Sequence, residues 1–275
     1  MKIFLLGATG FLGSLVREAL AAEKLATFCT RRSDLSFSKS GDITLTINAQ
    51  AQLNEADVVI NCIAETNFEK CRENSNHNVN TSVPLFLQKN LYDNQYLIHL
   101  STDAFYDSEN NHSSENDPVS IRSEYAEQKL MAEDIVKSLN SVILRTSFVG
   151  LNHRNSGMVN ALLNAKDQEI NGWSNVFTSS VHSSDLVQLI IKLINRRKKG
   201  IFNFGSERFY SKYDFLCALS TRLSNNVNVN SINYHDDTRN YNCGMSSEKI
   251  KKELNLKLPT FESVVESTIT EINEK

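Results

Sequence analysis

Short apolar runs alternate with helical patterns through the first half of the chain. The runs are Lys2–Leu6, Ala26–Cys29, Ile43–Thr46, Asp57–Asn61, Tyr96–Leu100 and Ser141–Leu144. Each has the length of a strand and is mostly apolar, which is typical of buried strands. Strands that alternate with helices predict right-handed βαβ units, and therefore a parallel, doubly wound sheet of the α/β class.

The segment between the first two runs shows the clearest helical periodicity. Its apolar side chains recur every three or four residues, at Leu12, Leu15, Val16, Ala19 and Leu20. This spacing places them on one face of a helix that can pack against the sheet. Further helices are predicted over Val83–Leu91 and Tyr125–Leu139.

Three later segments break the alternation. Asp107–Ser123 is rich in Ser, Asn, Asp and Glu, and is predicted as an exposed loop. Leu151–Val181 lacks clean strand periodicity, and Ser206–Lys275 is mostly helical with a polar interlude at Asn225–Asp237. An inserted lobe therefore begins near residue 151.

These breaks predict two domains. Residues 1–150 are expected to form the sheet domain, to which residues 176–205 return. Residues 151–175 and 206–275 are expected to form a smaller, mainly helical substrate-binding lobe.

The composition is that of a globular chain without a strong charge bias. The 275 residues carry 29 basic and 32 acidic side chains, which gives a formal net charge of −3, and 40% are hydrophobic. Such a chain has enough apolar material for a large core and no global attraction to nucleic acid or to an anionic membrane. We expect neither as a partner.

The five cysteines are odd in number and no two have Cys-x-x-Cys spacing, which disfavours a disulfide framework and a thiolate zinc site. The histidines also lack metal-ligand spacing, so no metal site is expected. Free thiols suit a reducing compartment, and we expect a cytoplasmic protein. The basic and then apolar start resembles a signal peptide, but Arg17 and Glu18 interrupt it.

Three glycines lie directly between the first strand and the first helix, in the segment GATGFLG. Gly7 suits a tight turn, Gly10 suits close approach to a pyrophosphate, and Gly13 suits close packing of the helix on the strand. The start of that helix then offers free N–H groups to phosphates. The turn predicts a dinucleotide site in a Rossmann-type sheet.

The end of the second strand favours one dinucleotide over the other. An acidic residue there would bind the adenosine ribose of NAD, but the chain has Arg31 and Arg32 after Cys29-Thr30. A guanidinium group can pair with a 2′-phosphate, which predicts NADP, used as NADPH, with NAD as the other option. The alternative is that both arginines are solvated loop charges.

Tyr125 and Lys129 have the spacing Y-x-x-x-K on a predicted helix, so they share one face. A free tyrosine has a pKa of about 10, and a nearby cation moves that pKa toward neutrality. Thr102 follows the strand Tyr96–Leu100, at the end where open parallel sheets place ligands. The three side chains together predict proton transfer to a substrate carbonyl oxygen; the alternative is that Tyr125 and Lys129 belong to an ordinary amphipathic helix and that Thr102 is structural. The chain lacks the G-x-S-x-G motif of α/β-hydrolases and the G-x-x-x-x-G-K-[ST] motif of P-loop NTPases.

In combination, the motifs resemble the extended short-chain dehydrogenase/reductase family, also called the NAD-dependent epimerase/dehydratase family. Its dTDP-4-dehydrorhamnose reductase branch is the most similar. The matching segments are GATGFLG, DVVINCIA at Asp57–Ala64, NVNT at Asn78–Thr81, STDAFYD at Ser101–Asp107, ENDP at Glu115–Pro118, YAEQKLMAE from Tyr125, LRTSFVG at Leu144–Gly150, VHSSDL at Val181–Leu186 and Leu258-Pro259.

The resemblance implies a role for each matching residue. Tyr125 would deliver a proton to the carbonyl oxygen, Lys129 would bind the nicotinamide ribose and lower the pKa of the tyrosine, and Thr102 would hydrogen-bond the same oxygen. Asp103 and Phe148, with Thr102, would contact the substrate. The residues expected to bind the cofactor are Gly7, Thr9, Gly10, Phe11, Leu12, Gly13, Arg31, Arg32, Cys62, Ile63, Ala64 and Lys129.

Three positions depart from the family pattern, namely Ala104, Ala126 and Ser180, where tyrosine, glycine and proline are common. Ala104 also removes one of the two acidic groups that related 4,6-dehydratases need after the threonine. The resemblance therefore implies an NADPH-dependent reductase of a nucleotide-linked 4-keto-6-deoxy sugar, for polysaccharide synthesis. A nucleotide-sugar 4-epimerase and a non-catalytic, dinucleotide-binding regulatory subunit stay open, as does a homodimer.

Overall fold

A computed structural model describes residues 1–38, 42–73, 78–165, 168–223 and 227–274. The chain divides into two compact units, each built from three separate stretches. The first unit comprises Met1–Thr102, Ser123–Leu144 and Val187–Ile201, and the second comprises Asp103–Arg122, Arg145–Leu186 and Phe202–Lys275. The division of the chain into a cofactor domain and a substrate-binding lobe stays a prediction.

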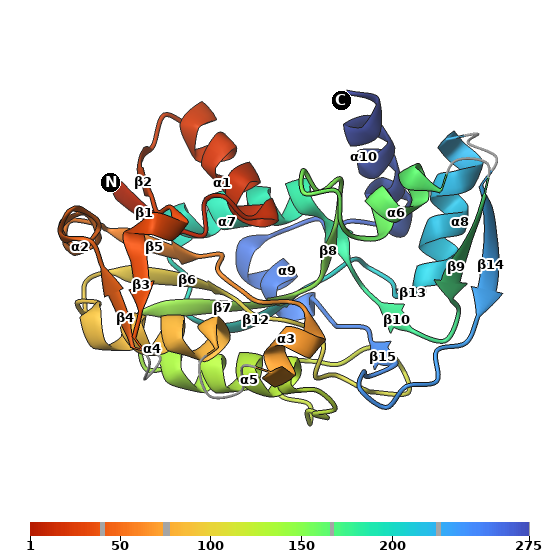
Figure 1. The fold of residues 1–275 in the computed structure, drawn as a ribbon, viewed down its shortest axis with the longest axis horizontal. Helices are drawn as coiled ribbons and strands as arrows, with labels where there is room; N and C mark the ends of the chain where they lie inside the picture. Colours follow the sequence, from red (N-terminus) through yellow and green to blue (C-terminus); the bar gives the residue numbers. More distant parts are fainter. Residues whose placement is uncertain (39–41, 74–77, 166–167, 224–226, 275) are drawn as a thin grey trace. The chain divides into compact units, whose positions relative to one another are not determined.

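A six-stranded sheet organises the first unit, with the strand order β12-β7-β6-β5-β1-β2 (Figure 1). The strands are β1 (Lys2–Leu6), β2 (Ala26–Cys29), β5 (Val58–Asn61), β6 (Tyr96–Leu100), β7 (Ser141–Thr146) and β12 (Gly200–Phe204). The pairs β1–β2, β1–β5, β5–β6 and β6–β7 are parallel. This confirms the predicted α/β fold with a doubly wound parallel sheet.

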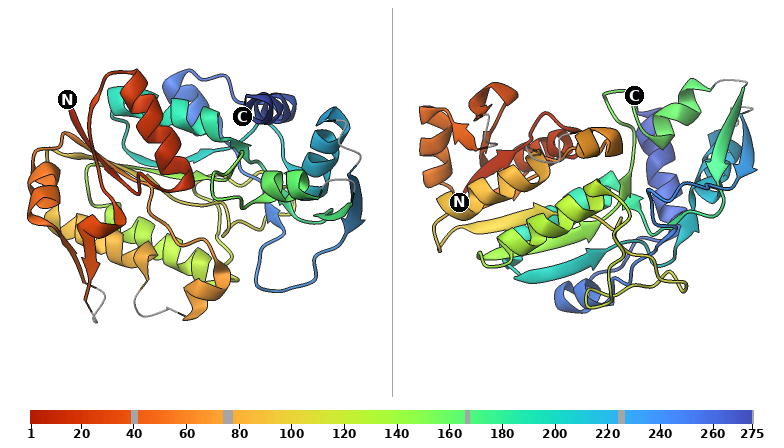
Figure 2. Two further views of the ribbon diagram at one scale, coloured as in Figure 1. Left: turned by 45° about the horizontal axis from the view of Figure 1, so that its top comes forward. Right: turned by 60° about the horizontal axis from the view of Figure 1, so that its bottom comes forward.

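Helices cover both faces of this sheet. In Figures 1 and 2, α1 (Phe11–Ala22) and α7 (Ser183–Arg196) flank one face, and α4 (Val79–Asn90) and α5 (Glu124–Val136) flank the other. The predicted helices are confirmed, although α4 begins four residues before the predicted Val83. Proline is common only in the first turn of a helix, so Pro84 favours a helix start near Val83. The structure instead places Pro84 inside α4.

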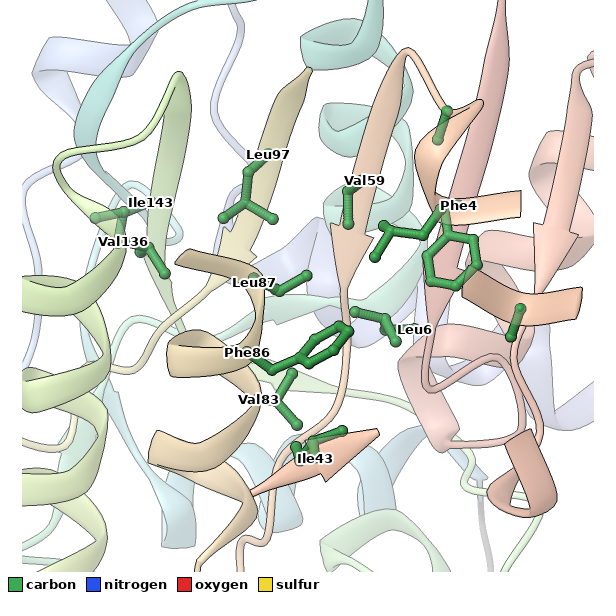
Figure 3. Packing of buried hydrophobic residues seen from close by; sticks show 13 residues of the cluster. Phe4, Leu6, Ile43, Val59, Val83, Phe86, Leu87, Leu97, Val136 and Ile143 are labelled. Atoms are coloured by element: carbon green, nitrogen blue, oxygen red, sulfur yellow. The ribbon is translucent and has the colours of Figure 1, made fainter. Parts of the chain in front are cut away.

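The core between the sheet and α4 follows from the alternation of side chains along the strands. Phe4 and Leu6 are two residues apart, so both side chains point to the same face of the sheet (Figure 3). There they join the strand residues Val59, Leu97 and Ile143 and the helix residues Val83, Phe86, Leu87 and Val136. All of these side chains are buried, and their burial positions the strand ends that carry the candidate site.

One predicted strand lies outside the parallel sheet. β4 (Ile43–Leu45) pairs antiparallel with β3 (Leu35–Phe37), and α2 (Ile47–Asn54) follows directly. The side chain of Thr46 caps that helix by accepting a hydrogen bond from the backbone of Ala49. A short apolar run looks the same in a local hairpin and in a central strand, because periodicity alone carries no information about the pairing partner.

The second unit combines helices with short strands. Its paired strands are β8 (Phe148–Val149) with β11 (Val181–His182), β9 (Glu169–Trp173) with β14 (Asn228–Ile232), and β13 (Tyr210–Ser211) with β10 (Phe177–Thr178) and β15 (Asn242–Cys243). Its helices are α6 (Met158–Asn164), α8 (Lys212–Leu223), α9 (Glu248–Leu254) and α10 (Phe261–Asn273). The strands β9 and β10 fall in Leu151–Val181, which lacks clean strand periodicity. The strands β13, β14 and β15 fall in Ser206–Lys275, which was predicted as mostly helical, and β14 has the polar sequence NVNSI.

Among the described residues, no helix is both long and apolar enough to cross a membrane. All five cysteines have free thiols.

The packing of α4 generates a test with an internal control. Leu87 is fully buried, whereas Leu85 on the same helix is 41% exposed. We expect Leu87→Ala to lower the free energy of unfolding by about 2–5 kcal/mol, because it removes buried methyl groups and leaves a cavity. Leu85→Ala should change it by less than about 0.5 kcal/mol. Urea unfolding followed by circular dichroism measures both, and equal losses would contradict the assigned face of α4.

Candidate active site

The turn after β1 depends on glycine at two positions. Gly7 has a φ of +79°, and a Cβ there would lie 3.0 Å from the backbone of Cys62. At Gly13, in the first turn of α1, a Cβ would lie 2.0 Å from the carbonyl oxygen of Gly7. No side chain fits at that distance, so glycine allows α1 to start in direct contact with the turn.

The first turn of α1 is open to an anion. Gly10 precedes the helix and provides no side-chain cap, and the first turn contains no acidic residue. Thr9 and Phe11 flank Gly10 and are at least partly exposed, whereas Leu12 is buried under the helix. Free N–H groups and the helix dipole therefore favour a phosphate at this point, which fits the pyrophosphate of a dinucleotide.

The predicted 2′-phosphate ligands lie at the end of β2. Arg31 and Arg32 are both exposed, and the guanidinium carbon of Arg32 lies 5.0 Å from the centre of the Phe37 ring. The preceding Thr30 is buried and donates its backbone N–H to the carbonyl of Leu5. This hydrogen bond holds the backbone at the end of β2, directly before Arg31 and Arg32.

The end of β5 borders the glycine turn. The backbone N–H of Ile63 donates to the side chain of Asn61 at 3.1 Å, which shapes the segment Cys62-Ile63-Ala64. Burial raises the pKa of the Cys62 thiol to about 12, and the charge of Lys129 opposes that rise. Cys62 is therefore a neutral thiol. The glycine turn, the end of β5 and Lys129 lie close together, because Cys62 is near both Gly7 and the charge of Lys129.

Tyr125 lies in the first turn of α5. That helix begins after Ser123, whose hydroxyl accepts a hydrogen bond from the backbone N–H of Ala126. The tyrosine ring stacks on Phe68 of α3 (Phe68–Glu73), with 5.4 Å between ring centres and 21° between planes. The cap fixes the start of the helix and the stacking limits rotation of the ring.

A buried amide pair joins α4 to α5. The amide nitrogen of Asn80 donates to the side chain of Gln128 at 3.1 Å and to the carbonyl of Glu65 at 3.0 Å. Gln128 in turn donates to the carbonyl of Cys71. The matched segments contain both Asn80 and Gln128, but no role was predicted for Gln128, because a glutamine next to Lys129 has no signature of its own. Its place between Tyr125 and Lys129 was the available signal.

Lys129 is a buried lysine of the first unit. Only 3% of it is exposed, and its ammonium group donates to the carbonyl of Leu100 at 2.5 Å. Burial lowers its pKa to about 8, while the carboxylate of Glu133 favours the charged form. The hydroxyl of Ser101 holds Glu133 through a hydrogen bond of 2.5 Å. Lys129 is thus a buried cation at neutral pH.

Thr102 is buried directly after β6, two residues beyond the carbonyl that Lys129 contacts. The structure therefore brings the glycine turn, the end of β5, Lys129 and the end of β6 together within the first unit. Asp103 and Phe148 belong to the second unit, where Phe148 forms β8 and pairs with Val181 of β11.

The carboxyl group of Asp103 ends a chain of hydroxyl groups. It is buried, which raises its pKa, and it accepts a hydrogen bond from Thr178 at 3.1 Å. The hydroxyl of Thr178 lies 2.8 Å from that of Ser180, which lies 2.7 Å from that of Ser147. A proline at position 180 would remove the middle hydroxyl. Ser180, which departs from the family pattern, therefore provides a hydrogen-bond partner for the Thr178 hydroxyl that contacts Asp103.

The described residues include no candidate metal site, and the buried histidine His99 is uncharged. Among the described residues, no group of three or more His, Cys, Asp or Glu side chains could hold a metal ion, and His77 lies outside the described residues. The buried residue His99 lies 3.3 Å from Asn61, and burial lowers the pKa of its imidazole well below 6.5. It is therefore a neutral part of the core.

Comparisons with known proteins show the family and the fold of the chain. A family profile described as RmlD substrate binding domain matches residues 1–274. The crystal structure of a dTDP-4-dehydrorhamnose reductase from Clostridium acetobutylicum is 22% identical, with a TM-score of 0.84 over 99% of this chain and 100% of that one. The enzyme of the same name from Bacillus anthracis, in complex with NADP, is 20% identical, with a TM-score of 0.82 over 98% of this chain and 99% of that one.

A curated relative matches part of the chain. The probable low-salt glycan biosynthesis reductase Agl14 of Haloferax volcanii is 35% identical over 162 residues. The match covers 54% of this chain and 54% of that protein, so it spans about half the length of the relative.

The buried charge of Lys129 is expected to lower the free energy of unfolding at neutral pH. The pKa of Lys129 is about 8 in the folded protein, against 10.5 for an ordinary lysine. Below pH 8 the folded state must keep a buried charge, and this penalty fades as the pH rises toward 10.5. We expect Lys129→Met to raise the free energy of unfolding by about 1–3 kcal/mol at pH 7.

Urea unfolding at pH 7 and pH 10 measures this effect, and the gap between the two proteins should narrow at pH 10. Lys137→Met is the control, because Lys137 lies on the same stretch with 62% of its side chain exposed. A variant of Lys129 that is less stable than the wild type at pH 7 would contradict the assigned burial cost.

Proposed function

Because the chain belongs to the RmlD substrate binding domain family, we propose that it is an NADPH-dependent reductase of a nucleotide-linked 4-keto-6-deoxy sugar. The observation that carries the proposal is the buried cation Lys129, one helical turn from Tyr125 and in contact with the strand end that leads to Thr102. The names of the relatives, which include two dTDP-4-dehydrorhamnose reductases and a glycan biosynthesis reductase, support the substrate class.

The cofactor site fits a dinucleotide with a 2′-phosphate. The open first turn of α1 receives the pyrophosphate, and the glycine turn lets it approach the backbone. Arg31 and Arg32 meet the 2′-phosphate at the end of β2, which favours NADP over NAD. When bound, NADPH supplies a hydride to the keto carbon of the sugar.

The residues of the chain supply the proton and fix the carbonyl. Tyr125 donates its phenolic proton to the carbonyl oxygen, so that the ketone gains one hydride and one proton and becomes an alcohol. Thr102 hydrogen-bonds the same oxygen and orients it toward Tyr125. The ammonium of Lys129 stabilises the phenolate left behind and binds the nicotinamide ribose.

The position after Asp103 supports a net reduction. Elimination of water would need a second acidic group there, and Ala104 offers only its backbone carbonyl, which accepts a hydrogen bond from Asn240. The same enzyme acting as a 4-epimerase would return the hydride and consume no NADPH. The cytoplasmic location and the homodimer stay predictions.

Replacing the proton donor tests the reaction. We expect Tyr125→Phe to lower turnover about 100- to 10,000-fold, because the developing alkoxide loses its proton source. Affinity for NADPH should stay within about twofold of wild type, since the phenol is not required to bind the dinucleotide. The assay follows NADPH absorbance with a panel of nucleotide 4-keto-6-deoxy sugars.

Tyr92→Phe serves as the control, because Tyr92 follows the C-terminal end of α4 and is 55% exposed. Consumption of NADPH with one sugar, lost only in Tyr125→Phe, supports the reductase. No consumption with any sugar, despite tight NADPH binding, contradicts it and favours the epimerase or the regulatory subunit.

Replacing the arginines tests cofactor choice. We expect Arg31→Ala and Arg32→Ala each to weaken NADPH binding about tenfold and to leave NADH binding unchanged, because NADH has no 2′-phosphate. Arg72→Ala, at another exposed arginine, is the control. Titration of the intrinsic fluorescence of each dinucleotide gives the affinities, and an equal loss for NADH would assign the arginines another role.

A further inference from the structure

A pair of buried polar side chains lies at the end of the apolar core of the first unit. Asn61 ends β5, and His99 of β6 is its direct partner in the parallel register. Val59 and Leu97, two residues earlier on the same strands, point into the core between the sheet and α4 (Figure 3). Side chains two residues apart on a strand share a face, so Asn61 and His99 point to the same side. Only 2% of Asn61 and 1% of His99 is exposed.

The side-chain amide of Asn61 has one allowed orientation. The backbone N–H of Ile63 donates to Oδ1 of Asn61 at 3.1 Å. An NH₂ group cannot accept this hydrogen bond, so the oxygen of the amide has to face Ile63. The nitrogen of the amide, Nδ2, then lies 3.3 Å from Nδ1 of His99. The backbone therefore sets the amide so that it presents a donor to the imidazole.

This donor fixes the tautomer of His99. Nδ1 has to accept the hydrogen bond from Asn61, so the proton of the neutral imidazole is on Nε2. The Nε2 atom is buried and has no hydrogen-bond partner among the residues that the structure describes. The donor direction thus runs from Ile63 through Asn61 to His99.

The charges around the imidazole keep it neutral. Burial lowers the pKa of His99 well below 6.5, and the positive charge of Lys129 on α5 lowers it further. Glu133, one helical turn along α5, supports the charge of Lys129, and the thiol of Cys62 is neutral. A protonated imidazole would place a second cation near Lys129 and would turn Nδ1 into a donor that faces the donor of Asn61.

We propose that His99 is a positioning residue for the cofactor-binding segment Cys62–Ala64, which it holds through Asn61. The acceptor Nδ1 holds the amide of Asn61, and the oxygen of that amide holds the N–H of Ile63. The role of Cys62–Ala64 as a contact of the cofactor rests on the proposed function.

The segment that follows β5 has little room to shift. The N–H of Cys62 donates to the carbonyl of Leu6 on β1, whereas the next N–H, that of Ile63, donates to the side chain of Asn61. A Cβ at Gly7 would lie 3.0 Å from the backbone nitrogen of Ile63, so the segment borders the glycine turn. The orientation of one amide therefore affects the backbone beside the turn that is predicted to bind the pyrophosphate.

Packing alone does not explain an imidazole at position 99. A leucine would occupy a similar volume and would leave no buried N–H group without a described partner. The benefit of the histidine therefore lies in its other nitrogen, which accepts from Asn61.

Nitrogen NMR of the full-length protein, labelled with ¹⁵N-histidine, reads the tautomer without any turnover. The signal of His99 is identified by its loss in His99→Asn, and the exposed His153 gives the reference for a solvent-accessible imidazole. We expect His99 to carry its proton on Nε2 and to stay neutral from pH 8 to pH 6, because its pKa lies well below 6.5. A proton on Nδ1, or a titration midpoint near 6.5, would overturn the proposal.

Variants of His99 separate the acceptor from the packing. His99→Leu removes the acceptor and should weaken NADPH binding about tenfold, whereas His99→Asn keeps an oxygen near the place of Nδ1 and should stay within about threefold of wild type. Ile98→Val is the control, because Ile98 is equally buried on the same strand but points to the opposite face. Wild-type NADPH affinity in His99→Leu, or an equal loss in Ile98→Val, would overturn the proposal.

Reversing the amide gives an independent readout. In Asn61→Asp the carboxylate can accept from Ile63 but has no N–H for His99, so the imidazole should move its proton to Nδ1 or gain a second one. An unchanged tautomer and charge of His99 in this variant would overturn the proposal. The NMR spectra and the NADPH affinities need no sugar substrate, so failure of the reductase assay and failure of this positioning role are distinguishable.

Discussion

The contact between the start of α1 and the end of β1 depends on the missing side chain at Gly13. A methyl group there would occupy the space of the Gly7 carbonyl oxygen, so the helix would have to move away from the turn. At the same place the N-terminus of α1 has no side-chain cap, Gly7 has a positive φ, and the backbone of Cys62 lies close to Gly7. A phosphate can therefore bind to backbone groups alone, with no charged side chain in the first helical turn.

Both units place a lysine where water is scarce. Lys129 is buried beside the end of β6 with Glu133 as its counter-charge, and Lys212 lies over an indole ring with a second cation nearby. In each case burial lowers the pKa of the lysine, and the neighbouring charges raise or lower that pKa further. The carboxylate of Glu133 supports the charge of Lys129, whose pKa is about 8, whereas burial, with added repulsion from Arg239, lowers the pKa of Lys212 to about 7.

Sequence patterns predicted the parallel sheet, its main helices and the glycine turn because each depends on local chemistry. Continuous apolar strands, one amphipathic helix and three glycines are visible within short windows of the chain. The antiparallel place of Ile43–Leu45 was not visible, since pairing depends on residues elsewhere. The same holds for the link between Asn80 and Gln128, which lie far apart in sequence and meet only after folding.

The hydroxyl groups of Thr178, Ser180 and Ser147 form a row with a direction. When Asp103 is ionised it can only accept, so Thr178 must donate to it, Ser180 must donate to Thr178, and Ser147 must donate to Ser180. All three O–H dipoles then point toward the carboxylate and reinforce one another. The ionised carboxylate therefore fixes the donor direction of all three hydroxyl groups. Once Asp103 is protonated it can donate as well as accept, so the hydroxyl groups are free to reverse their donor directions.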